Sequence, residues 1–212
     1  MDQHTSPPRD SAADSAAESA GGGGRTPVTP AATLRVWDRL VRVLHWTLVL
    51  SVLTAWLTTK LPGATAAKVH EWAGYLVLAV IALRVMWGLA GPRYARFARF
   101  VRGPAHTLAY ARQLVTHTEP RHLGHNPLGG WMIVALLSCA VLTAASGWLY
   151  TTDRFWGIEW VETTHIWLTN LLLTLAAVHV AGAIFTGWRQ RENLIAAMFS
   201  GNKRAPQPGD IE

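Results

Sequence analysis

The stretch HIWLTNLLLTLAAVHVAGAIFTGW, residues 165–188, contains no Asp, Glu, Lys or Arg. An uncharged run of this length matches the roughly 20 residues that a helix needs to cross the hydrocarbon core of a bilayer. Val43–Thr59 and Leu128–Thr152 are equally free of charge, and Trp72–Ala90 contains only Arg84. Half of the 212 residues are hydrophobic, and they fall in these blocks, which argues against a soluble enzyme. We predict an all-α integral membrane four-helix bundle, with spans at about residues 43–59, 70–90, 128–150 and 165–188.

The formal net charge of +6 is distributed unevenly along the chain. Cations gather before the first span, between the second and third, and after the fourth: Arg35, Arg39, Arg42, Arg93, Arg96, Arg99, Arg102, Arg112, Arg121, Arg189, Arg191, Lys203 and Arg204. The connection between the first and second spans and the connection between the third and fourth spans contain few cations. Because cytoplasmic loops carry the excess of Lys and Arg, we expect a multi-pass protein with both termini and the long middle loop in the cytoplasm. The same placement favours contact with membrane lipid over nucleic-acid binding.

Three segments outside the spans have their own composition. Residues 1–33 are rich in Ser, Ala, Gly and Pro, which predicts a disordered cytoplasmic tail. Residues 201–212 are expected to form a C-terminal cytoplasmic tail of the same kind, so that the folded domain covers residues 34–200. In the middle loop, Phe97–Leu114 alternates apolar and cationic residues, which predicts a short helix on the membrane surface.

The chemistry of the spans must come from histidine, because the apolar runs contain no Asp, Glu or Lys that could relay protons or bind a transported ion. Two of the nine histidines, His165 and His179, lie 14 positions apart in the last span. On an α-helix this spacing places them about 40° apart on one face and ~21 Å apart along the axis. The last span therefore presents two candidate ligands at two depths.

The same spacing relates the first span to the last. His45 lies 14 positions before Thr59, at the opposite end of its span, so it shares the depth of His179. His70 opens the second span and shares the outer depth of His165. Any one of these side chains alone could be an interfacial or hydrogen-bonded histidine. Together, two imidazoles at each of two levels predict two bis-histidine haems, whereas zinc prefers four close ligands in a tetrahedron.

The single Cys139 excludes covalent c-type haem attachment, which needs two cysteines in a C-x-x-C-H motif. Three glycines in the spans, Gly74, Gly147 and Gly182, are candidates for the close approach of a helix or a haem ring, and plain helix contact is the commoner reason for such residues.

Four segments carry a resemblance to a known family: RVWDRLVRVLHW (35–46), VHEWAGY (69–75), GHNPLGGWM (124–132) and RENL (191–194). In order and spacing they resemble the bacterial cytochrome b561 family, in particular the group that includes b-type cytochrome subunits of nickel hydrogenases. The resemblance covers about residues 34 to 204. It implies a di-haem electron carrier of the bacterial inner membrane, with haem b liganded by His45, His70, His165 and His179. It also implies that the carrier links quinone, such as ubiquinone, to a periplasmic or membrane-bound redox protein, which would be a c-type cytochrome or a dehydrogenase or hydrogenase subunit.

Arg84 and His125 are further candidate site residues, and each has two interpretations. Arg84 lies 14 positions after His70, at the inner depth, where a haem propionate would be a suitable partner for a guanidinium. Alternatively, its side chain extends to the cytoplasmic headgroups. His125, before the third span, is either a surface or capping residue or a proton exchanger at a cytoplasmic quinone site.

Two classes of function remain open at this point. The first is an electron-transfer subunit of the respiratory chain that serves a separate redox protein. The second is a self-contained oxidoreductase that passes electrons between quinone and a small molecule such as superoxide. The short outward connections, Thr58–Val69 and Asp153–Thr164, favour the first, because they offer little surface for a substrate pocket.

Overall fold

The computed structural model describes residues 33–211. It contains four long helices: α1 (Arg39–Thr58), α2 (Ala64–Ala90), α5 (Pro127–Tyr150) and α6 (Glu159–Arg189). Each is long and apolar enough to cross a membrane. The predicted all-α bundle of four membrane helices is therefore confirmed.

Two of the helices begin earlier than the predicted spans. α2 begins at Ala64 rather than near residue 70, and α6 begins at Glu159 rather than near residue 165. Hydropathy detects only the segment inside the hydrocarbon core, while polar residues can continue a helix beyond it. In α6 the first turn carries Glu159 and Glu162, whose negative charge suits the positive end of the helix dipole.

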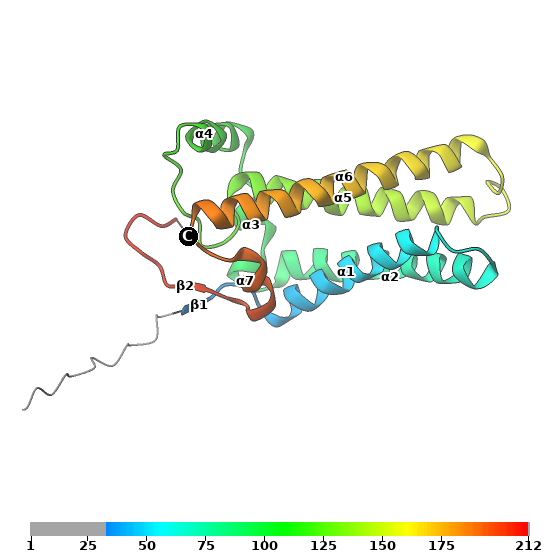
Figure 1. Ribbon diagram of the computed structural model, residues 1–212, viewed down its shortest axis with the longest axis horizontal. Helices are drawn as coiled ribbons and strands as arrows, with labels where there is room; N and C mark the ends of the chain where they lie inside the picture. The colour runs from blue at the N-terminus through cyan, green and yellow to red at the C-terminus, as the bar shows by residue number, and fades with distance from the viewer. Residues whose placement is uncertain (1–32, 212) are drawn as a thin grey trace, which may run out of the picture. The chain divides into compact units, whose positions relative to one another are not determined.

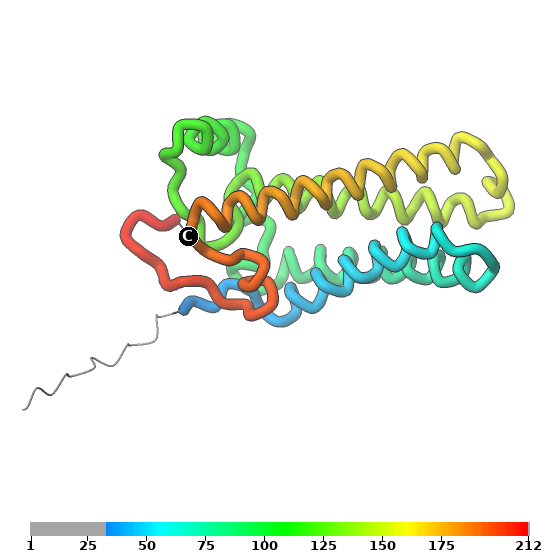
Figure 2. Tube along the Cα trace, in the orientation of Figure 1, coloured from blue at the N-terminus to red at the C-terminus, as the bar shows by residue number. Residues whose placement is uncertain are grey.

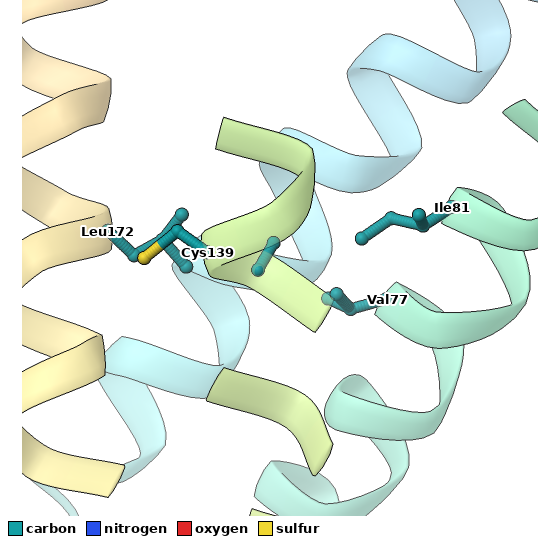
Figure 3. Close-up of a cluster of buried hydrophobic side chains, with 5 residues drawn as sticks. Val77, Ile81, Cys139 and Leu172 are labelled. Carbon is teal, nitrogen blue, oxygen red and sulfur yellow. The ribbon is translucent and has the colours of Figure 1, made fainter. Parts of the chain in front are cut away.

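The four helices form two hairpins. α1 packs along α2 and α5 packs along α6, while α2 and α5 join the two hairpins (Figures 1 and 2). We call the end with the connections 59–63 and 151–158 the hairpin end, and the end where α1 begins and α6 stops the terminal end. The central apolar cluster draws on α2, α5 and α6, as Figure 3 shows, and consists of Val77, Ile81, Cys139, Ala140 and Leu172.

The connection between α2 and α5 folds into short helices at the terminal end. They are η1 (Arg93–Ala95), α3 (Phe97–Phe100) and α4 (Pro104–Val115). The single surface helix predicted over Phe97–Leu114 is therefore wrong in its extent. Val101 and Gly103 have extended backbones, and a residue that precedes a proline, as Gly103 precedes Pro104, avoids the helical conformation.

The C-terminal segment is ordered, contrary to the expectation that residues 201–212 resemble the N-terminal tail. After α7 (Leu194–Ser200), β2 (Asn202–Arg204) pairs antiparallel with β1 (Thr33–Arg35). Arg121 then holds the segment by contacts to Asp210 at 2.6 Å and Glu192 at 3.1 Å. We call this arrangement of β1, β2 and the Arg121 ion pairs the clasp. The predicted N-terminal tail, residues 1–33, lies outside the described residues except for Thr33.

Candidate functional site

One pair of predicted site residues meets between α2 and α6, toward the hairpin end. The ring centroids of His70 and His165 are 6.1 Å apart, and their planes are inclined by 76°. Nδ1 of His70 lies 2.8 Å from the carbonyl oxygen of Ala55, and Nδ1 of His165 lies 3.0 Å from that of Thr143. Because a carbonyl oxygen only accepts, each Nδ1 carries the proton and each Nε2 keeps a free lone pair.

This geometry fits a metal-centred group between the two rings. A metal–imidazole bond is about 2 Å long, so two rings whose centres are 6.1 Å apart are close enough that both could hold one metal ion. Among residues 33–211 there is no group of three or more His, Cys, Asp or Glu side chains that could hold a metal ion. Two imidazoles without further protein ligands suit a metal whose remaining ligands come from a macrocycle, as in haem.

A glycine makes room for one of these rings. A Cβ atom on Gly147 of α5 would lie 2.9 Å from Cε1 of His165, which is too close for the ring to keep its place. Gly74 and Gly182 differ, since a Cβ atom at either would meet nothing within 4 Å. Of the three glycines that the sequence singles out, Gly147 is thus the one that contacts a predicted ligand.

The second pair lies nearer the terminal end. His45 on α1 is half-buried, interacts electrostatically with His179 on α6, and makes an edge contact with Trp46. No ring contact joins His45 and His179 within the described part of the chain. Nδ1 of His45 is buried and has no hydrogen-bond partner among residues 33–211. His70 and His165 are thus in ring contact, whereas His45 and His179 are related only by their electrostatic interaction.

Arg84 is buried on α2 and reaches toward the loop that follows its helix. Its Nη2 donates to the carbonyl oxygen of Ala95 at 3.2 Å, and its guanidinium lies 4.7 Å from the ring centre of Phe97. The other terminal nitrogen, Nη1, is buried and has no partner among residues 33–211. The side chain is thus turned to the terminal end, with one donor left available.

Asp38 and Phe97 lie near Arg84, and the sequence did not predict either as a site residue. Asp38 caps α1 by accepting from the amide of Val41 at 2.9 Å, accepts from Nε1 of Trp87 at 3.2 Å, and interacts electrostatically with Arg84. An aspartate directly before the first helical residue is a recognisable capping signal. Its contact with α2, however, joins residues far apart in the chain and has no local signature.

His125 lies among aromatic rings at the terminal end. Its ring lies 4.4 Å from that of Trp37 and 4.8 Å from that of Phe100, and its Nδ1 has no hydrogen-bond partner among the described residues. Burial, and secondarily the charge of Lys203, lowers the pKa of His125 to about 3. The imidazole is therefore neutral at physiological pH.

Fold and site together define a class: a membrane bundle of four helices in which the rings of His70 and His165 meet, which is a suitable frame for haem. The family model of the prokaryotic cytochrome b561 matches residues 36–201, and the chain belongs to this family. The predicted resemblance is thereby confirmed. The chain is therefore a b-type cytochrome that functions in electron transfer, and cytochromes of this class carry haem b.

Two curated relatives are similar over most of their length. A "Probable Ni/Fe-hydrogenase B-type cytochrome subunit" of Rhizobium leguminosarum bv. viciae is 24% identical over 210 positions, covering 79% of this chain and 87% of the relative. A protein of the same name from Azotobacter vinelandii is 23% identical over 223 positions, covering 85% and 92%. No solved structure matches this chain.

Proposed function

We propose that this protein is a di-haem cytochrome that carries electrons across the bacterial inner membrane, between a periplasmic redox partner and the quinone pool of the respiratory chain. The observation that carries the proposal is the meeting of the His70 and His165 rings toward the hairpin end, with His45 and His179 left as the ligands predicted nearer the terminal end. Haem b at each level would supply a reversible one-electron iron centre. Two centres are needed because the levels are separated by ~21 Å of helix.

The chain's own residues would orient and tune these centres. Carbonyl oxygens of Ala55 and Thr143 fix the tautomer and the direction of the outer histidines, and a hydrogen bond on Nδ1 raises the basicity of the opposite nitrogen. At the inner level, the free Nη1 of Arg84 is a donor suited to a carboxylate such as a propionate. The loops at the hairpin end are short, which supports a carrier that serves a partner over an enzyme with its own substrate pocket.

Both relatives are named as Ni/Fe-hydrogenase subunits, which supports a hydrogenase as the periplasmic partner. Ubiquinone is the quinone that we expect. In proteoliposomes, electrons from such a partner should reduce the haems and then quinone. The alternative, a self-contained oxidoreductase, predicts that superoxide reduces quinone through the purified chain without any partner. Rapid quinone reduction by superoxide alone would favour that alternative.

The number of haems is the most direct test. A pyridine haemochrome assay on the purified chain should give two haem b per polypeptide, both low-spin and six-coordinate, because each level offers two imidazoles. Visible spectra of the reduced protein with and without carbon monoxide check the coordination. A stoichiometry near one, or carbon monoxide binding in the intact protein, would contradict the di-haem proposal.

A further inference from the structure

A small pocket lies at the terminal end, outside the histidine pairs. It has a volume of about 80 Å³ and opens between the loop that contains η1 and α3, the start of α5, and Ile211 near the C-terminus. Aromatic and apolar side chains form part of its wall. The rest is basic, and no Asp or Glu lines it; the cationic and imidazole residues of the lining are Arg93, Arg99, Arg102, His106, His122 and His125.

Two of these arginines carry charge that the protein does not neutralise. Neither Arg99 nor Arg102 has a carboxylate partner among residues 33–211. The contrast with Arg121 is clear, since its guanidinium contacts both Asp210 and Glu192. Two arginines without a carboxylate partner in the lining of a pocket favour an anionic ligand.

The charge of the pocket comes from its arginines. Burial lowers the pKa of His122, and burial lowers that of His125 to about 3, so both imidazoles are neutral near pH 7. A guanidinium keeps its charge at all physiological pH values and forms paired hydrogen bonds with phosphate oxygens. A phosphate group suits this lining, because its oxygens can accept hydrogen bonds from more than one guanidinium.

The size of the pocket limits the ligand. Its volume of about 80 Å³ is several times the roughly 10–15 Å³ that one water needs by the same measure. Sites for larger organic ligands, such as a quinone, span about 300–1,000 Å³. The pocket therefore has room for a compact anionic group and not for a quinone ring.

Its surroundings point to the membrane surface. The amphipathic helix α4, beside the pocket, exposes Leu108 and Val115, as an interfacial helix does. The indole of Trp131, at the start of α5, donates to the backbone carbonyl of Arg102 at 2.9 Å and is itself exposed. Tryptophan prefers the headgroup region of a bilayer, so this hydrogen bond places Arg102 at headgroup depth.

We propose that this pocket is a phosphate site in which Arg99 and Arg102 hold the headgroup phosphate of an anionic phospholipid. Basic pockets on the cytoplasmic side of membrane proteins bind such headgroups. Free inorganic phosphate has the same chemistry and is the other possible source of the group. The proposal does not depend on the number of haems or on the identity of the redox partner.

The test titrates the delipidated full-length protein, in neutral detergent, with phosphatidylglycerol, phosphatidylcholine or inorganic phosphate, and follows binding by native mass spectrometry. The unaltered protein should bind one phosphatidylglycerol in preference to phosphatidylcholine. Each guanidinium near an anionic headgroup contributes about fivefold in affinity, so Arg99→Gln with Arg102→Gln should weaken binding about 25-fold. Arg112→Gln is the matched control, because Arg112 is exposed on α4 and does not line the pocket.

The source of the phosphate follows from the same titrations. Lipid binding that millimolar inorganic phosphate does not displace assigns the site to a headgroup, while displacement together with direct phosphate binding assigns it to the free ion. Arg99→Lys with Arg102→Lys keeps the charge and should retain part of the affinity. Circular dichroism verifies that each variant is folded. If the double variant does not fold, the two single variants replace it, and each should bind the lipid about fivefold more weakly than the unaltered protein. The proposal is overturned if the Gln variants bind phosphatidylglycerol as tightly as the control does. It is also overturned if the unaltered protein binds the two lipids equally.

Discussion

The imidazole of His165 is held by three residues of α5. Its Nδ1 lies 3.0 Å from the carbonyl oxygen of Thr143 and 3.1 Å from Oγ of Ser146, and Gly147 leaves the space that the ring occupies. His70 has a corresponding carbonyl contact with Ala55. Side chains that are oriented in this way lose little further entropy when they bind a ligand, which is a property of preorganised sites.

The grouping of the histidines predicts how ligand substitutions combine. Replacing His45 or His179 by Ala should remove the inner haem and leave the outer one, so each variant should keep about one haem per chain. His45→Ala with His179→Ala should resemble either single variant, because both changes affect one site and do not add. His45→Ala with His70→Ala should lose nearly all haem, because it affects both sites. Pyridine haemochrome assays on the purified variants measure these counts.

Circular dichroism and membrane insertion provide the control for these variants, since loss of haem must be separated from loss of the bundle. If the His45–His70 double variant keeps one haem while the His45–His179 double variant loses both, the grouping is wrong.

Arg84 offers a second test at the scale of one residue. If its free Nη1 faces a propionate, Arg84→Leu should lower the reduction potential of the inner haem by an amount on the order of tens of millivolts, because a nearby positive charge stabilises the reduced state. The outer haem should change less. Arg84→Lys, which keeps a charge, should lie between the two proteins. Potentiometric redox titration resolves the two haems, and unchanged potentials in the Leu variant would support a purely structural role in the bond to Ala95.

At the scale of the helices, the apolar runs predicted which segments would span but not where each helix would stop. Hydropathy identifies only the segments that lie in the bilayer interior, so it does not detect a polar first turn such as Glu159–Glu162. The middle loop shows a related limit. Its alternation of apolar and cationic residues indicated a surface helix, and the proline at the start of α4 determined that the helix is divided.

The clasp has no local signal in the sequence. Residues 201–211 have a composition typical of a tail, yet they pair with β1 and with Arg121. Arg121 and Asp210 are 89 positions apart, and Glu192 is 71 positions from Arg121. Only the tertiary structure brings the three charges together, and the burial of their side chains strengthens the attraction.

At the scale of the whole molecule, the positive-inside pattern predicts the orientation. In a Cys139→Ser background, Asp153→Cys at the hairpin end should react with a membrane-impermeant maleimide in intact spheroplasts, whereas Thr116→Cys should react only after lysis. Both positions are exposed, so accessibility to the reagent depends on the side of the membrane alone. Equal labelling of the two in detergent is the control. The reverse pattern in spheroplasts would contradict the predicted orientation.

The sequence by itself determined the class of this protein: four membrane helices, the residues that could serve as ligands, and the family. It could do so because hydropathy, charge placement and helical spacing follow from the order of residues along the chain. The tertiary structure alone decided that Gly147 makes room for His165, that Arg84 turns toward Ala95, and that Arg121 holds the C-terminal segment. Each of these depends on atoms brought together from distant positions, and no local pattern encodes such contacts.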